Sequence, residues 1–549
     1  MRLQRERIGG GAALIAAAVV LVSCGGEVVP TERTTAGGAV VRSSVSVAGS
    51  TAPANPTTHA AAPQFDRALA QVYQGDGMAD AQVTKVLVLM PGFLGGAGNF
   101  DYLARRIVER SGGMTAVWAV DRRSNALEDQ TGLDAAEAAQ DADVAKRYYF
   151  HGAAIGGKTF AGFVAGKNVT FQSEWGIKVH VEDLDALITA AIARYPHAAI
   201  FLGGHSLGGS IVPIYAAWDF GAYAGFERLS GLVLLEGTAA PKGPTDIPRQ
   251  SSYETTGLNA GGGVSSLKSV RANPIVSLPF IGPDLFVTSE ILAMRVAFGR
   301  PQALNPDGDL VANFLSVLFG LTTVPPTTNA AAFGLGFDND FEPLAFARVS
   351  IGTAAGGPIG PNPNAALFGG FVGPNDTLLA PTDSTATYTW IPRSQQTPPD
   401  PTDIATFAHV MFAGPSNFIE WYFPARLTLD VGVTAGLNVQ PSGDWRKDVY
   451  GLAVTENARV DLPVFAVGGG HGLVPDVTKF YPYRDSIAPT LRNGAPRNGV
   501  GAGFQTRLQD GYVHLDVLTA YDEAAGNGEF QALVDWMDEA VQLAPPPAR

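Results

Sequence analysis

Ser206 lies in the sequence GHSLG, which places a glycine two positions to either side of a candidate nucleophile. The apolar run AAIFL at 198–202 precedes this motif, and a segment with helical patterning follows it at 210–219. A serine on a sharp turn from strand to helix has a strained backbone and needs small neighbours. The turn lifts the hydroxyl above the sheet and points a helix N-terminus at it, where negative charge is favoured. The motif predicts a nucleophile for acyl transfer; an inert serine in a glycine-rich turn is the alternative.

A serine hydroxyl needs a general base near neutral pH, and this base is most often histidine. If the chain order is serine, acid, histidine, three of the eight histidines are available, namely His409, His471 and His514. His409 falls in a segment that we predict to be a cap. His514, in GYVHLD, lies just before the last predicted helix, where a base can reach over the sheet edge to Ser206. We predict His514 as the base and expect His205, beside the serine, to point away from it.

The oxyanion of a tetrahedral intermediate needs two backbone N–H donors. One is the N–H of Leu207, which follows the nucleophile. We expect the other from the loop PGFLGG after the first core strand, with Phe93 as the donor. The glycines in this loop let the backbone approach a substrate closely. A turn that is glycine-rich for steric reasons alone is the alternative.

Most of the candidate site residues lie at the ends of apolar runs that alternate with helical patterns. Five apolar runs are predicted to be strands buried on both faces: 85–90, 116–120, 198–202, 231–235 and 463–467. Helical patterns follow or separate them, and a last amphipathic helix covers 530–541. Buried strands that alternate with helices predict a parallel sheet with helices on both faces. The predicted fold class is therefore α/β, with a doubly wound, mostly parallel sheet.

The segment between the fourth and fifth predicted strands is far longer than an ordinary connection. It is rich in Pro, Gly and Phe and contains helix-like apolar runs. We predict a large cap domain at 238–461 that is inserted into a core formed by 64–237 and 462–549. A separate domain elsewhere on the surface is the alternative. Acidic turns in this segment, such as DNDFE at 338–342, lack the spacing of a calcium loop and are expected to be solvated.

The N-terminus has the parts of an export signal in the right order. A basic stretch, MRLQRERIGG, precedes the apolar GAALIAAAVVLVS, which is too short to span a bilayer, and then Cys24. This order resembles a bacterial lipoprotein signal, here 1–23, in which the cysteine becomes the first residue and carries diacylglycerol. The resemblance implies lipidation of Cys24 and a membrane anchor at the cell envelope; an ordinary signal peptide or anchor helix is the alternative. Residues 24–63, with few aromatics, are predicted to be a flexible tether.

The composition limits the classes of partner. The chain has 549 residues with 46% hydrophobic and 16% charged residues, which is enough for a sizeable core. The net charge of −14 and the absence of a Lys/Arg cluster argue against a nucleic-acid partner. One cysteine permits neither an intramolecular disulfide nor a thiolate metal cluster. We predict no cofactor and no metal.

The motifs PGF, GHSLGG and YVHLD together resemble those of α/β-hydrolases of the lipase/esterase type, over roughly 85–235 and 462–543. Members of this superfamily are mostly carboxylic ester hydrolases, and some act on amides, thioesters or lactones without a cofactor. The resemblance implies that the chain cleaves apolar esters through an acyl-enzyme intermediate. The alternatives are hydrolysis of amide, thioester, lactone or polyester bonds, and a non-catalytic surface lipoprotein that uses the fold as a binding module.

The same resemblance implies an aspartate in a loop of the form G-x-x-D-x-x-V-P after the fifth strand. Here the loop reads GGGHGLVP, with His471 in the place of the aspartate. Asp476 follows this loop but is expected to point away. Glu236 directly follows the fourth buried strand, where a carboxylate is costly without a partner, and some α/β-hydrolases carry their acid there. We predict Glu236 as the acid that orients His514, with Asp476 as the alternative and His471 as a bystander.

Overall fold

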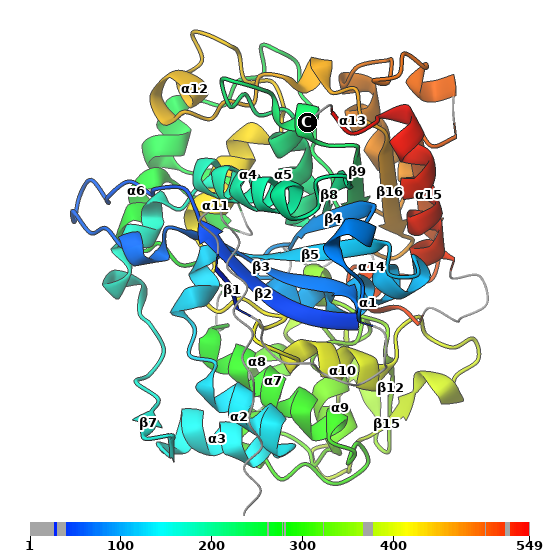
Figure 1. Ribbon diagram of the computed structural model, residues 1–549. Coiled ribbons are helices and arrows are strands. Elements are labelled where there is room, and N and C mark those ends of the chain that lie inside the picture. The colour runs from blue at the N-terminus through cyan, green and yellow to red at the C-terminus, as the bar shows by residue number, and fades with distance from the viewer. Residues whose placement is uncertain are drawn as a thin grey trace, which may run out of the picture.

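A nine-stranded sheet forms the centre of the protein (Figure 1). The computed structural model describes residues 27–29, 40–260, 263–276, 278, 281–321, 323–365, 377–499, 501–521 and 528–547. The strands of this sheet, in spatial order, are β1 (Glu27–Val29), β2 (Val40–Ala48), β3 (Arg67–Gly75), β5 (Thr115–Asp121), β4 (Lys85–Met90), β8 (Ala199–His205), β9 (Gly231–Leu235), β16 (Val464–Gly469) and β17 (Phe504–Gln509). The strands from β5 to β17 run parallel, and β1 to β3 form an antiparallel edge. The predicted fold class, α/β with a doubly wound and mostly parallel sheet, is confirmed.

Helices cover both faces of the sheet. The helices among the described residues, those of the insertion included, are α1 (Asp101–Arg110), α2 (Thr131–Ala139), α3 (Ala142–His151), α4 (Ile177–Arg194), α5 (Leu207–Ala216), α6 (Leu267–Ala272), α7 (Pro283–Ala297), α8 (Gly308–Phe319), α9 (Asn329–Gly334), α10 (Ile404–Phe412), α11 (Ala425–Thr434), α12 (Trp445–Tyr450), α13 (Tyr481–Ser486), α14 (Asp516–Thr519) and α15 (Glu529–Leu543). In β4, Leu87 and Leu89 face the core that contains α1 and α15. Val86 and Val88 face the opposite core, with α4 and α5. A strand that is apolar at every position after Lys85 is thus buried on both faces, as the sequence predicts.

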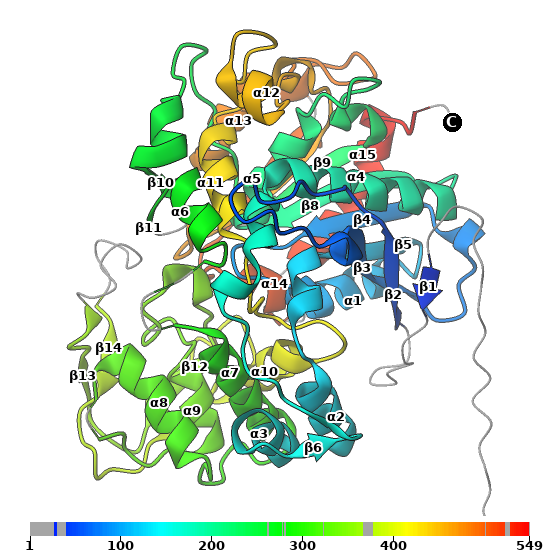
Figure 2. The ribbon, with the colours of Figure 1, turned by 90° about the vertical axis from the view of Figure 1, so that its left-hand side faces the viewer.

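The long insertion between β9 and β16 does not form one separate body (Figure 2). Helices α7 to α10 form a lobe with α2 and α3, which come from an earlier part of the chain, before α4. In contrast, α6 and α11 pack together, and α11 lies against α4 and α5 of the core. The predicted cap over 238–461 is therefore an insertion, but one part of it completes a core layer. The predicted boundaries also miss 131–151, which belongs spatially to the cap lobe.

Short two-stranded sheets complete the fold. They are β6 (Ala154–Ile155) with β7 (Lys158–Thr159), β10 (Leu258–Ala260) with β11 (Gly263–Ser265), β12 (Gly352–Ala355) with β15 (Thr389–Pro392), and β13 (Ile359–Pro361) with β14 (Leu379–Pro381). Three of these four pairs lie within the insertion. Among the described helices, none is both long enough and apolar enough to cross a membrane.

The predicted flexible tether over 24–63 is wrong for its second half. Residues Val40–Ala48 form β2, which pairs with β3 along its whole length. Farther along, the buried Arg123 donates to the Ser50 carbonyl (2.8 Å) and forms an ion pair with Asp66 (2.8 Å). The composition misled the prediction because β2 mixes serines with valines and lacks a continuous apolar run, although Val40, Val45 and Val47 are buried in it. The predicted signal 1–23 and Cys24 lie outside the described residues.

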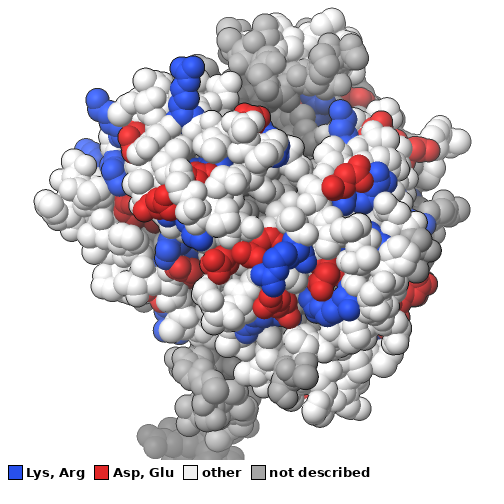
Figure 3. Space-filling model, turned by 90° about the horizontal axis from the view of Figure 1, so that it is seen from above, with Lys and Arg blue, Asp and Glu red and all other residues white. Residues whose placement is uncertain are grey.

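Charged side chains of both signs are interspersed on the face seen from above (Figure 3). Among the described residues visible there, basic side chains do not gather into an extended patch.

We predict that β2 is required for a stable fold. A chain that begins at Gly49 loses the strand and exposes one edge of β3, whereas a chain that begins at Ala39 keeps it. Val45 and Val47 are buried in β2, so the shorter chain should lose on the order of 3 kcal/mol of unfolding free energy. Thermal or urea unfolding of the two purified chains measures this difference. Equal stability of the two chains would contradict the prediction.

Candidate active site

Ser206 occupies the predicted sharp turn between β8 and α5. Its backbone has φ of +56° and ψ of −120°, a strained conformation for a residue with a side chain. A Cβ on Gly204 would lie 2.3 Å from the Gly208 carbonyl oxygen, and one on Gly208 would lie 2.0 Å from the Met90 carbonyl oxygen. Both glycines of the motif are therefore required by close backbone approach. This turn presents the serine at the C-terminal edge of the parallel strands.

Glu236 follows β9 and is fully buried, with a positive φ of +49°. Backbone N–H groups of the loop after β16 donate to its carboxylate: Gly469 at 2.5 Å, Leu473 at 2.6 Å and Val474 at 3.3 Å. A Cβ on Gly472 would lie only 2.2 Å from one carboxylate oxygen. The glycine-rich loop is thus a cradle that satisfies a buried carboxylate with backbone donors.

The unexpected histidine of this loop lies outside the cradle. The side chain of His471 is exposed, while its backbone N–H donates to the Tyr512 carbonyl at 2.9 Å. Asp476 is also exposed, and its carboxylate accepts from the Thr478 N–H at 2.8 Å, as the cap of a short helical turn. Of the two carboxylates considered for the acid position, Glu236 and Asp476, the structure brings only Glu236 to His514.

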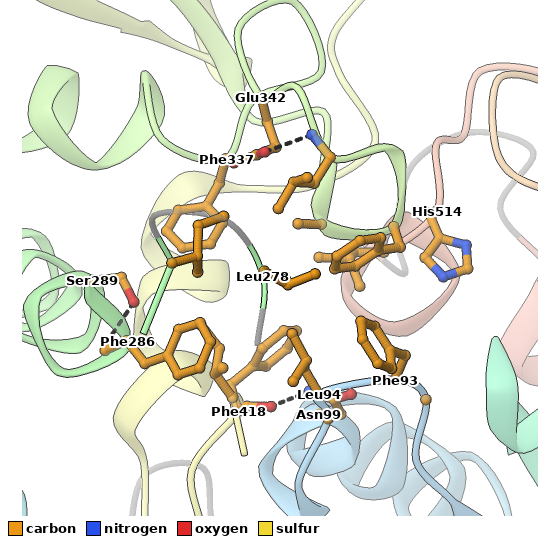
Figure 4. Close-up of a pocket in the computed structure, with 18 of the residues that line it drawn as sticks. Phe93, Leu94, Asn99, Leu278, Phe286, Ser289, Phe337, Glu342, Phe418 and His514 are labelled. Atoms are coloured by element: carbon orange, nitrogen blue, oxygen red, sulfur yellow. Dashed lines mark hydrogen bonds between the residues drawn. The ribbon is translucent and has the colours of Figure 1, made fainter. Parts of the chain in front are cut away.

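His514 and Glu236 form a hydrogen bond inside the protein. Nδ1 of His514 lies 3.0 Å from Oε2 of Glu236, and the two side chains are 1% and 0% exposed. The other ring nitrogen, Nε2, has no hydrogen-bond partner among the described residues. His514 and Ser206 line the same pocket, and Figure 4 shows the imidazole at its margin. The three predicted residues thus converge from three separate loops.

His205 does not point away as expected. Its ring packs against that of His514 with centroids 4.5 Å apart, and its Nε2–H donates to the His514 carbonyl oxygen at 3.0 Å. Burial, together with the neighbouring His514, holds the pKa of His205 well below its usual range, so its imidazole is neutral. His205 therefore fixes the backbone of the residue that faces the serine. The sequence places His205 next to Ser206 but does not reveal that the 512–516 loop passes over it.

The loop that carries Phe93 lies directly beside the serine. A Cβ on Gly92 would lie 2.9 Å from the Cβ of Ser206. Leu207 begins α5, so its N–H is one of the helix N-terminal donors without an intrahelical acceptor. Within the described part of the chain, the Phe93 N–H has no hydrogen-bond acceptor either. Two backbone N–H groups without an acceptor among the described residues, those of Phe93 and Leu207, therefore lie next to Ser206 in space and in sequence respectively, and their role as oxyanion donors stays a prediction.

Arg122 holds this loop from behind, a role that the sequence did not reveal. The fully buried guanidinium donates to the carbonyl oxygens of Pro91 (2.5 Å), Gly92 (2.8 Å) and Gly95 (2.7 Å). Its charge is balanced by Glu420 of the insertion, at 2.8 Å. The Gly92 carbonyl and the Phe93 N–H belong to one trans peptide unit and point in opposite directions, so the bond from Arg122 to this carbonyl turns the Phe93 N–H away from the guanidinium. The sequence around Arg122 does not indicate its partner, because Glu420 lies almost 300 residues later in the chain.

An apolar pocket opens beside Ser206 and His514 (Figure 4), with about 830 Å³ of empty space including its mouth. Its apolar walls are formed by Phe93, Leu94, Leu278, Ile281, Leu285, Phe286, Phe314, Leu318, Phe337, Leu344, Phe346, Ala347, Phe418, Ile419 and Leu515. The acidic turn at 338–342, which we expected to be solvated, is buried instead at Asp338 and Glu342. No group of three or more side chains able to ligate a metal occurs among the described residues.

An open groove lies on the other side of Ser206. Residues 237–241, Lys479 and Pro482 line it, and it shares Phe93, Ser206 and Phe346 with the apolar pocket. Ser206 therefore lines both an apolar pocket and a more open, more polar groove.

The insertion also holds the loop of His514. The carboxyl group of Asp516 accepts hydrogen bonds from the Val513 N–H (2.9 Å), the Ser350 N–H (3.1 Å) and the Thr402 hydroxyl (2.7 Å). Burial raises the pKa of Asp516 to about 7, and these donors oppose that shift. Ser350 and Thr402 belong to the insertion, so these hydrogen bonds connect the insertion to the loop that carries His514.

Comparisons with known proteins give a likeness of fold. No protein-family model matches the sequence, and no curated protein does. A candidate lipase from Sulfolobus solfataricus overlaps with a TM-score of 0.42 at 12% identity, covering 91% of this chain and 94% of the other. A peroxisomal alpha-beta-hydrolase from Saccharomyces cerevisiae gives 0.37 at 10% identity, covering 93% and 92%. A monoacylglycerol lipase from Paleococcus ferrophilus gives 0.31 at 10% identity, covering 83% and 96%. Likeness at this level carries no argument about the reaction, which must come from the site itself.

We predict that Glu236→Gln lowers kcat by about 10²-fold or more in any reaction that uses Ser206 and His514. An amide at this position places an NH₂ group against backbone donors or deprives His514 of its acceptor. Asp476→Asn and His471→Ala serve as matched controls, because both side chains are exposed, and each should change kcat by less than about threefold. Steady-state kinetics of the three variants makes the comparison. A crippled Asp476→Asn, or a nearly unaffected Glu236→Gln, would overturn the assignment.

Proposed function

We propose that the protein is a serine hydrolase that cleaves carboxylic esters through an acyl-enzyme intermediate. The observation that carries this proposal is the buried His514–Glu236 hydrogen bond, which leaves Nε2 of His514 unpaired at the pocket of Ser206. A histidine oriented in this way by a carboxylate is the base that a serine nucleophile needs.

In the proposed reaction, the Ser206 hydroxyl oxygen attacks the ester carbonyl carbon while Nε2 of His514 takes its proton. Glu236 accepts the hydrogen bond from Nδ1–H and stabilises the imidazolium that forms. The backbone N–H groups of Phe93 and Leu207 bind the oxyanion of the tetrahedral intermediate. His514 then returns the proton to the departing alkoxide, which releases the alcohol. Water attacks the acyl-enzyme by the same steps, regenerating Ser206 and releasing the acid.

The two spaces beside Ser206 favour one orientation of the substrate. The acyl group stays bound through both halves of the reaction, whereas the alcohol must leave and water must enter between them. We place the acyl chain in the enclosed apolar pocket and the alcohol in the open groove. Apolar walls of this extent stabilise a hydrocarbon chain by about 0.8 kcal/mol for each buried CH₂ group.

We predict that the purified chain hydrolyses p-nitrophenyl esters and that Ser206→Ala lowers kcat by about 10³-fold or more. A panel of acyl chains of graded length, with amides, thioesters, lactones and a polyester included, tests the class of bond. Release of p-nitrophenol and of the free acid gives the rates. A folded protein without activity on any of these, or with activity unchanged by Ser206→Ala, would leave the fold as a binding module.

We also propose that the protein is exported and held at a membrane of the bacterial cell envelope by lipid on Cys24. The order of basic, apolar and small residues before this cysteine supports the proposal. The acyl chains would anchor the protein while the hydrolase body remains in water.

Metabolic labelling with a radiolabelled fatty acid in bacterial cells tests the anchor. The full chain should be labelled, and Cys24→Ser should not, because the thiol is the attachment point. The single cysteine makes this variant unambiguous. Equal labelling of the two chains would exclude Cys24 as the anchor.

A further inference from the structure

One carboxyl group lies in the wall of the otherwise apolar pocket. Glu342 is 4% exposed and lines the cavity from the loop that precedes β12. Its Oε1 accepts a hydrogen bond from the Leu344 N–H at 2.7 Å. No described residue donates a hydrogen bond to Oε2 or accepts one from it. Half of this carboxyl group is therefore available to something that occupies the pocket.

The carboxyl group is neutral over most of the physiological pH range. Burial raises the pKa of Glu342 to about 8, against the opposing effect of the Leu344 N–H and of Arg348. A neutral carboxyl group both donates and accepts hydrogen bonds. An oxygen left without a partner in an apolar surrounding costs free energy that a polar ligand atom would recover.

Two other polar side chains of the pocket already donate to backbone carbonyl groups. The Ser289 hydroxyl donates to the Phe286 carbonyl at 2.7 Å, and the Asn99 amide donates to the Phe418 carbonyl at 2.6 Å. Figure 4 shows Glu342 across the pocket from Asn99 and apart from His514. A group that reaches Glu342 therefore lies at a distance from the ester bond at Ser206, on the chain rather than at the reacting carbonyl.

We propose that Glu342 determines substrate specificity by hydrogen bonding to a hydroxyl group on the apolar acyl chain, so that the preferred substrates are esters of hydroxylated fatty acids. This inference rests on the proposed ester hydrolysis. A hydroxyl group suits the site because it can accept from the neutral carboxyl group or donate to it.

Paired p-nitrophenyl esters test the proposal, each pair having the same chain length with and without one hydroxyl group at positions scanned along the chain. For the best position, wild-type kcat/KM should favour the hydroxylated ester by about tenfold or more, since an unpaired polar group disfavours the plain chain. Glu342→Gln keeps a donor, an acceptor and the contact to Leu344, and should retain the preference. Glu342→Met should abolish or reverse it.

The ratio within each variant separates specificity from folding, because a damaged fold lowers both rates together. Ser289→Ala is a matched control, since its hydroxyl is already paired, and the ratio should be unchanged. No preference at any position in the wild type, or an undiminished preference in Glu342→Met, would overturn the inference while plain esters are still hydrolysed. Absence of hydrolysis of every ester by the wild type would instead overturn the proposed function, and with it this inference.

Discussion

The site depends on a buried carboxylate that the fold must satisfy. Glu236 directly follows the central strand β9 and is buried from water. An unpaired charge at such a position would cost roughly several kcal/mol of folding free energy. The loop after β16 solves this with backbone N–H groups at short distance, and His514 supplies the remaining donor. These demands explain why the loop is rich in glycine and why no side chain is possible at Gly472. They also explain why a histidine is tolerated at position 471. The loop binds Glu236 through backbone N–H groups, and the exposed side chain of His471 takes no part in this binding.

The same principle, a buried charge that organises a backbone, recurs on the other side of Ser206. Arg122 binds three carbonyl groups of the loop that carries Phe93, and Glu420 of the insertion balances its charge. Asp516 in turn joins the His514 loop to Ser350 and Thr402 of the insertion. The insertion therefore supplies walls of the pocket and also supports the two loops that flank Ser206. Replacing it with a short loop would remove partners of both the oxyanion loop and the histidine loop, and with them the geometry that even a small ester needs.

Features of the site that depend on neighbouring residues could be predicted from the sequence, whereas contacts between segments far apart in the chain could not. Ser206 is recognisable from a local steric requirement, and Glu236 from a carboxylate at the end of a buried strand, so both could be read from neighbouring residues. His514 required in addition an argument from chain order. The Arg122–Glu420 pair and the stacking of His205 on His514 join segments that are about 300 residues apart, and no local pattern encodes them. The β2 strand was missed for the opposite reason, because its small polar residues lack the apolar run that marks a buried strand.

Phe93 links substrate binding to the chemistry of the site. Its backbone N–H flanks Ser206, while its ring forms part of the wall between the apolar pocket and the open groove. That ring packs edge-on against Phe346 (5.4 Å between centroids) and Phe423 (5.0 Å). Arg122, which fixes the loop's carbonyl groups, also lies 4.8 Å from the centre of the Phe423 ring. Phe93 therefore belongs both to the wall of the pocket and to the proposed oxyanion site, and Arg122 contacts the loop and the aromatic cluster alike. In the proposed reaction, contacts that a bound chain makes with this residue are contacts with the loop that carries the proposed donor, so chain binding and transition-state stabilisation share one structural element.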